Sequence, residues 1–501
     1  MSAFVTDQFR ILNAGSFVES ISNNSYYAFL GLSNPTPGSV GFGRTDNWDT
    51  STTNNPVDNF QYLSHYRDTS LFGKKITSEN ARRVIRKVEW VANTPYDMYR
   101  HDYRQGNESP VSKTVRLYDA NYYVVTSEFK VYICIDNGSS GTDPTVTGST
   151  IEPTQTDVEP PVAGSDGYRW KYLFSISPSD VIKFDSTEYI TVPNDWLTTT
   201  DSDIQTIREG GNSDTNNNQV KAVYIEDGGT GYSNATASIV GDGSGGEVSI
   251  VVDSSGTITN VNVTSGGKDY TYGIIDLRTN SGSGSKLIPI IPPSKGHGYN
   301  IYEELGTDKV LMYARFDDSS KDFPIDTKFA QVGIIKNPET FSGAGVTFTE
   351  NSFSSLYAVG LTTSREVTIG EQITQNVTGA KGYVASFDKD TKVLKYYQDR
   401  SLCYGNKVDQ TDSDNTTNTI EFDSSNDITF STGGSSSIDT ALTGSVVVVN
   451  DKQINLGVTF TNGLANPEIN KKTGTVIYID NRPTVQRDSR QKEDIKIILE
   501  F

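Results

Sequence analysis

Apolar and polar residues alternate along much of the chain, which is the pattern of β-strands that bury one face. In the alternating run "YVVTSEFKVYICI" (123–135), the polar stretch Thr126–Glu128 predicts two strands joined by a turn. Tyr383–Gln398 predicts a hairpin that turns at Asp388–Thr391. The final segments "TVIYID" and "DIKIILEF" alternate as well, so we expect the last strand to pair within a central sheet or with a partner strand.

Helix signals are few and short. Ser177 followed by Pro178 places a cap and a first-turn proline before "SDVIKF". The segment "SDIQTIREGG", from Ser202, begins with a capping serine and ends with a glycine pair. The segment "SENARRVIRKVEW" (78–90) is compatible with a helix or with a short turn followed by a strand, and we favour the second interpretation.

Composition shifts divide the chain into a body and two inserts. Aromatic residues are dense up to about residue 200, give way to glycine and serine from about 215 to 285, and return after 298. Within the first insert, "VYIEDGGTGY" (223–232) is repeated as "VNVTSGGKDY" (261–270) at a spacing of 38 residues. Each copy predicts a strand, a Gly-Gly turn with positive φ and a tyrosine that folds back onto the strand.

We therefore predict a mainly β protein with a few short helices, built as a multi-domain antiparallel β-sandwich body with small β inserts. The stretch from 409 to about 437 is expected to be a Ser/Asp-rich loop inside the second insert. The expected domains are 1–212 (first part of the body), 213–290 (repeat module), 291–360 (continuation of the body), 361–454 (second insert) and 455–501 (strands that complete the body). The body segments 1–200, 298–345 and 455–501 are expected to pack together.

The net charge of the chain indicates which classes of partner it can bind. The chain has 501 residues and a formal charge of -19, so its surface repels phosphate backbones and we expect neither nucleic acid nor membrane as a partner. The longest aliphatic run is Val446–Val449, far short of a membrane span. No signal peptide is recognised at the beginning of the sequence, so synthesis in a cytoplasm is expected.

The sequence offers no recognisable constellation for catalysis. The histidines, at positions 65, 101 and 297, lack zinc-site spacing, and both cysteines, Cys134 and Cys403, are expected to be buried free thiols. The segment "GDGSGG" (241–246) fits a dinucleotide motif but precedes a strand instead of the required helix. Asp269 beside a Gly-Gly pair is too isolated for a calcium repeat. We expect no catalytic residues, no cofactor and no metal.

Two segments are candidates for subunit contacts. "TPYDMYRHDY" (94–103) combines three tyrosines, an arginine and two aspartates; such residues are favoured at protein interfaces, although tyrosines in a core with hydroxyls satisfied by Asp and Arg fit equally. "NRPTVQRDSRQKE" (481–493) has a local excess of basic residues and is expected to be a loop, either solvated or docked on an acidic subunit. The candidate contact residues are Tyr96, Tyr99, Arg100, Tyr103, Arg482, Arg487 and Phe501.

Five segments, in order, resemble one protein family. They are "YYAFLG", "VEWVANTPYDMYRHDY", "FKVYICIDN", "DGYRWKYLFSI" and "GTVIYIDNRPTVQRDSRQKEDIKIILEF". Together they are similar to the baseplate wedge subunit of T-even-type contractile-tailed phages, the gene product eight family, in its marine and cyanobacterial myovirus form. The resemblance covers roughly 1–200, 298–345 and 455–501, and the two inserts depart from the shorter form of the family.

The resemblance implies a structural, non-enzymatic virion protein of the tail baseplate, assembled in the host cytoplasm. It implies a homodimer in each of six wedges, in contact with other wedge proteins such as gene products six, seven and ten. It also implies a part in baseplate assembly and in the rearrangement that triggers sheath contraction. A receptor- or carbohydrate-binding tail protein and a tail-associated glycan hydrolase are the alternatives.

Overall fold

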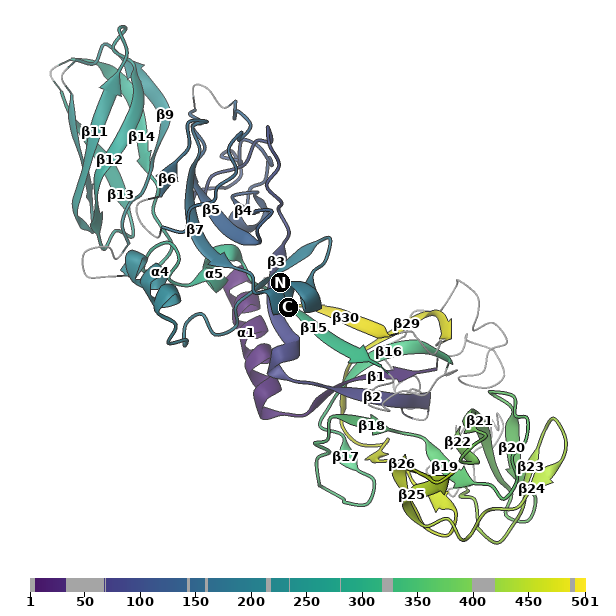
Figure 1. Cartoon of the computed structure of the whole chain (residues 1–501). Helices are drawn as coiled ribbons and strands as arrows, with labels where there is room; N and C mark the ends of the chain where they lie inside the picture. Colours follow the sequence, from purple (N-terminus) through teal and green to yellow (C-terminus); the bar gives the residue numbers. More distant parts are fainter. Residues whose placement is uncertain are drawn as a thin grey trace, which may run out of the picture. The chain divides into compact units, whose positions relative to one another are not determined.

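The computed structural model is dominated by antiparallel sheets (Figure 1). Strands hold 45% of the residues and helices 11%, which confirms the predicted mainly β class. None of the helices in the described ranges has the length and apolar character needed to cross a membrane. The structure describes residues 5–32, 67, 69–141, 145–157, 161–212, 218–233, 235–279, 281–317, 328–398, 420–486 and 492–501.

The chain forms two compact units, each built from separate stretches of sequence. Unit 1 comprises Met1–Val18, Arg82–Leu311 and Ile498–Phe501, and unit 2 comprises Glu19–Ala81 and Met312–Ile497. The first predicted insert falls in unit 1 and the second in unit 2. The segments expected to form a single body are divided between the two units, which differs from the prediction.

A four-stranded sheet carries the core of unit 1. Its order is β4 (Tyr123–Val125), β5 (Lys130–Asp136), β7 (Arg169–Ser175) and β6 (Val162–Ala163). β4 and β5 form the hairpin that alternation predicted. The short helices of this unit are η2 (Leu117–Asp119), α3 (Pro178–Phe184), α4 (Ser202–Asn212) and α5 (Ile301–Leu305).

A second four-stranded sheet contains the last strand of the chain. Its order is β30 (Glu493–Glu500), β15 (Lys309–Phe316), β3 (Ala81–Arg86) and β8 (Tyr189–Val192). η1 (Ser78–Asn80) precedes β3, so the turn-and-strand interpretation of this segment is confirmed. The final strand lies within a sheet, as predicted, and its Ile497 is 7% exposed.

Unit 2 contains a five-stranded sheet with the order β18 (Ser352–Ser354), β2 (Ser70–Ile76), β1 (Tyr26–Gly31), β16 (Lys328–Lys336) and β29 (Thr475–Gln486). The second insert contributes the first five strands of a seven-stranded sheet, and flanking segments supply the last two. The order is β24 (Ser435–Ser436), β23 (Ile428–Phe430), β20 (Gln372–Gln375), β21 (Ala380–Asp388), β22 (Val393–Tyr397), β19 (Tyr357–Gly360) and β27 (Leu464–Ala465). Two strand pairs complete the unit: β17 (Glu339–Thr340) with β28 (Ile469–Asn470), and β25 (Gly444–Val449) with β26 (Lys452–Phe460). β21 and β22 confirm the predicted hairpin.

Helix α1 (Asp7–Asn23), of 17 residues, was not predicted from the sequence. Its buried positions are Ile11, Ala14, Val18 and Ile21, which follow the three- and four-residue spacing of one helix face. Phe9 and Leu12 are 53% and 64% exposed, so apolar residues also occupy the other face and obscure the period. The Thr6 hydroxyl accepts the Phe9 amide at 3.3 Å at the beginning of the helix.

The predicted helix caps and the predicted loop at 409–437 are confirmed only in part. Ser177 caps α3 by accepting the Asp180 amide at 3.1 Å, as predicted. α4 is also present, but its cap is Asp201, which accepts the Ile204 amide, and not Ser202. The predicted loop at 409–437 contains β23 and β24, and its part before residue 420 lies outside the described residues.

The predicted loop at 481–493 is also partly wrong. β29 continues through Pro483 to Gln486 at the edge of its sheet. An edge strand tolerates a proline because its outward amides need no strand partner. The expected loop is therefore strand over its first half, and 487–491 lie outside the described residues.

The internal repeat is confirmed and is longer than the sequence match. Each copy has three strands: β9 (Val223–Thr230), β10 (Thr236–Gly241) and β11 (Ser244–Val252) in the first, and β12 (Ile258–Lys268), β13 (Gly273–Arg278) and β14 (Ser283–Pro289) in the second. The first strand of each copy pairs with the third strand of the other copy, β9 with β14 and β12 with β11. Exchange of strands between copies makes the module a single folded core of its own.

The Gly-Gly pairs lie inside strands and not in turns, which corrects the prediction. The second glycine of each pair, Gly229 and Gly267, has φ of +60° and +63°. A Cβ on either would lie 2.5 Å from a carbonyl oxygen of the paired strand. The following tyrosine folds back as expected: Tyr270 accepts the Gly246 amide at 3.1 Å, and the Ser285 amide donates to Tyr232 at 3.2 Å.

Alanine at Gly267 and at Gly245 distinguishes the cost of positive φ from the cost of a steric collision. Gly267→Ala should lower the free energy of unfolding of the module by more than about 2 kcal/mol, because it combines positive φ with overpacking. Gly245→Ala is the matched control on the paired strand: φ is +76° but the nearest heavy atom to the new Cβ is 3.8 Å away. It should cost about 1–2 kcal/mol. Hydrogen exchange of the β11 and β12 amides measures the loss of stability in each variant. Equal losses of stability in the two variants would contradict the predicted collision of the Gly267→Ala Cβ with the paired strand.

Candidate interface residues

The segment 94–103 folds into the core of unit 1. The Tyr99 amide donates to the Cys134 carbonyl of β5 at 2.8 Å, and the Tyr96 amide donates to the Tyr168 hydroxyl at 3.0 Å. The four candidates in this segment are nearly inaccessible: Tyr96 2%, Tyr99 5%, Arg100 2% and Tyr103 8% exposed. They belong to this chain's own core, as the alternative interpretation supposed, and a part in supporting a subunit contact stays a prediction.

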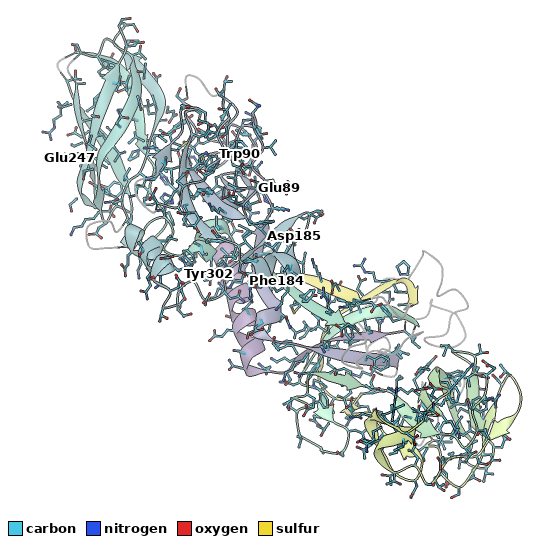
Figure 2. The ribbon with its side chains drawn as sticks, in the orientation of Figure 1. Glu89, Trp90, Phe184, Asp185, Glu247 and Tyr302 are labelled. Carbon is cyan, nitrogen blue, oxygen red and sulfur yellow. The ribbon has the colours of Figure 1, made fainter. Side chains whose placement is uncertain are left out.

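Tyrosine hydroxyls in this core bind backbone groups of nearby and of distant segments. The Tyr96 hydroxyl accepts the Val91 amide at 2.6 Å and donates to the Glu89 carbonyl at 3.1 Å. Tyr302 of α5, labelled in Figure 2, donates to the Pro193 carbonyl at 2.7 Å and accepts the Trp196 amide at 3.1 Å. Each buried ring therefore fixes a loop as well as filling space.

Arg100 and His101 hold the repeat module against this core. The Arg100 guanidinium makes a two-point contact with Asp102, at 2.9 and 2.7 Å, and lies 3.8 Å from the ring centre of Tyr224 in β9. The His101 Nδ1 accepts the Ile291 amide at 3.2 Å. Burial opposes ionisation of Asp102, but the hydrogen bond and charge of Arg100 outweigh it and hold the pKa of Asp102 below its ordinary value. Burial lowers the pKa of His101, which keeps Nδ1 available as an acceptor.

Two buried carboxylates were not singled out from the sequence. Asp97 is fully buried and accepts the amides of Val111, Ser112 and Asn121 at 2.9, 3.2 and 3.1 Å. Glu304 lies 2.6 Å from the His297 Nδ1 and accepts the Gly298 amide at 2.7 Å. Nothing in the local sequence pattern marks either group, because their partners, backbone amides together with the His297 and Ser112 side chains, are brought together by the fold.

The terminal candidates have different surroundings. Arg482 is on β29, with its side chain 65% exposed and its Nε 2.7 Å from the Asp480 carboxylate. The Phe501 ring packs on Phe17 at 5.4 Å, and its amide donates to the Asp308 carbonyl at 3.1 Å. Arg487 lies outside the described residues, as do His65 and Cys403. Of the seven candidates, Arg482 is thus the one that the described structure places on the surface with its charge exposed.

The remaining sequence expectations concern the cysteines, metal ligands and the glycine-rich motif. Cys134 is a free buried thiol, as predicted, and burial raises its pKa. In the described ranges, no group of three or more His, Cys, Asp and Glu side chains is arranged to hold a metal ion. The segment at 241–246 leads into strand β11, as expected.

Tyr96→Phe tests whether this residue serves the fold. Loss of the hydroxyl leaves the Val91 amide and the Glu89 carbonyl without this partner, so the free energy of unfolding of the isolated chain should fall by about 1–3 kcal/mol. Tyr272→Phe is the matched control, because Tyr272 is 61% exposed, and should change stability by less than about 0.5 kcal/mol. Urea unfolding measures both. An isolated Tyr96→Phe chain as stable as wild type would contradict the core role.

Buried tyrosines also predict loss of stability at alkaline pH. Burial raises the pKa of Tyr118 to about 12 and raises the pKa values of Tyr99, Tyr122 and Tyr123 above the ordinary value. Unfolded tyrosine ionises near pH 10, so above about pH 10 the unfolded chain binds fewer protons than the folded chain. The free energy of unfolding should therefore be level below this pH and fall as pH rises towards the folded values. Urea unfolding at stepped pH, with phenolate absorbance as a second readout, checks it; stability that is unchanged to about pH 11 would refute it.

The chain was compared with known proteins. No protein-family model matches it, and no curated protein matches it.

Proposed function

We propose that the chain is a structural subunit of the baseplate wedge of a contractile phage tail. In this role it forms a homodimer in the virion, contacts neighbouring wedge proteins and takes part in baseplate assembly and in the rearrangement that leads to sheath contraction. The proposed partners are the gene product six, seven and ten types. No catalytic step is assigned to it.

The observation that carries the proposal is where the family-like segments lie. "YYAFLG" is β1 and "GTVIYID" enters β29, and both strands pair with β16. "FKVYICIDN" and "DGYRWKYLFSI" contain β5 and β7, which pair with each other, while the segment 94–103 bonds to β5. Segments far apart in sequence therefore meet as the sheets and cores of the two units. The segments that carry the resemblance therefore belong to the buried sheets and cores of the two units and are not scattered surface loops.

Charge supports a docking role for β29. In a chain with a formal charge of -19, Arg482 presents an exposed guanidinium from an edge strand. An arginine can bind a carboxylate of another subunit through two parallel hydrogen bonds. Its guanidinium is 65% exposed, so solvent weakens its contact with the partly buried Asp480 and exchange for a partner's carboxylate costs little.

Arg482→Glu tests this docking role in co-expression of the chain with the wedge proteins of its phage. Wild type should co-purify with them as a dimer. The variant should keep the melting temperature of wild type and lose most of the co-purification, because like charges now face each other.

Arg278→Glu is the matched control, since Arg278 is also an exposed strand residue paired with the aspartate two positions before it, Asp276, at 3.0 Å. It should assemble like wild type. Normal assembly of Arg482→Glu would refute docking through β29, and failure of wild type to join any wedge protein would refute the proposed function.

A further inference from the structure

A hollow in unit 2 has the features of a ligand site. Its volume is ≈ 640 Å³, within the range of roughly 300–1,000 Å³ that is usual for small-molecule sites. It lies where the loop after β17, strands β19 and β26, and the segment after β27 come together. Its floor is buried and apolar, and includes Phe348, Val458 and Ala465.

One wall of the hollow is a connected row of aromatic rings. Phe341 contacts Tyr357 edge-on at 6.4 Å, Tyr357 stacks on Tyr396 at 5.5 Å, and Tyr396 meets Phe422 at 4.9 Å. Tyr396 and Phe422 are 3% and 5% exposed, whereas Phe341 is 36% exposed. The buried rings fix the position of the outer ones, so the row offers a pre-organised aromatic surface to a ligand.

A buried polar atom at the hollow has an unused hydrogen-bonding capacity. Gln398 lines the hollow and is 4% exposed, and its Nε2 donates to the carbonyls of Lys381 and Ile420 at 2.9 and 2.8 Å. Its Oε1 is buried and has no hydrogen-bond partner in the described part of the chain. Buried amide oxygens are nearly always paired, so an unpaired one beside a hollow indicates a donor group that belongs to a ligand or to water carried with it.

The rim supplies further polar groups. Exposed Thr459, Thr461 and Asn466 offer hydroxyl and amide groups, and Glu421 and Glu468 are the charged residues among those that line the hollow. Both are acidic, whereas the Lys471 ammonium lies 5.7 Å from the Tyr357 ring centre, so charges of both signs surround the hollow and no excess of one sign selects a charged ligand. An aromatic wall with hydroxyl, amide and carboxylate groups around it matches a neutral sugar. A sugar ring stacks its C–H face on an aromatic ring and places its hydroxyls where they both donate and accept.

We propose that this hollow binds a short neutral oligosaccharide, or a stretch of a neutral polysaccharide, with the exposed Phe341 ring stacked on a sugar ring and Tyr357 supporting it from the wall. The polar rim and Gln398 bind the hydroxyls. This binding is independent of the role in the wedge, since the residues that line the hollow all belong to unit 2 and no other subunit is needed.

The test is binding of the full-length chain to immobilised neutral oligosaccharides of glucose, galactose, mannose and N-acetylglucosamine, with polygalacturonic acid and a proline-rich peptide as comparison ligands. Wild type should bind at least one neutral glycan in preference to both comparison ligands. Phe341→Ala should weaken that binding about tenfold or more, while Tyr272→Ala, which removes an exposed aromatic ring of the other unit, should leave it unchanged.

The melting temperature of each variant shows whether it is folded, and because Phe341 is partly exposed its replacement should lower that temperature by only a few degrees. Absence of binding to any neutral glycan, preference for the acidic polymer or the peptide, or wild-type affinity in a folded Phe341→Ala chain would each overturn the proposal.

Discussion

The need to pair tyrosine hydroxyls governs the interior of this protein. Only 35% of its residues are hydrophobic, and 27 are tyrosines, so its cores have to be built partly from rings that carry a polar group. A buried hydroxyl without a partner costs free energy, and here the partners are mostly backbone groups of loops and short helices. Tyr122, for example, donates to the Glu304 carbonyl at 2.6 Å, and Tyr132 to the Gln155 carbonyl at 2.8 Å. A tyrosine ring can therefore be buried only if the loop or helix that pairs with its hydroxyl is held in place.

This constraint explains why an aromatic, charged segment became core instead of surface. Arg100, His101 and Asp97 use their polar groups to hold a neighbouring module and two loops, and each is satisfied within the chain. The surface features that remain for partners are different ones: the exposed charge of Arg482 and the aromatic hollow beside Phe341.

The sequence predicted those elements whose signal is local. Hairpins with a polar break, the Ser177 cap and the repeated tyrosines depend on neighbouring residues, and all are present. Helix α1 was missed because exposed Phe9 and Leu12 blur its buried face, and β29 was cut short because Pro483 is acceptable only at a sheet edge, a position that sequence does not reveal. For the interface candidates, composition could not distinguish a satisfied core from a contact surface. Both require Tyr, Arg and Asp, and the deciding fact, burial in the core of unit 1, is tertiary.

Electron cryo-microscopy of the intact tail that carries this chain tests the central claim most directly. The account predicts density for its two units in the baseplate, in two copies per wedge around the hub, with β29 of each copy facing another subunit. Density for the chain only at the tips of fibres, or a baseplate that is complete without it, would contradict the account.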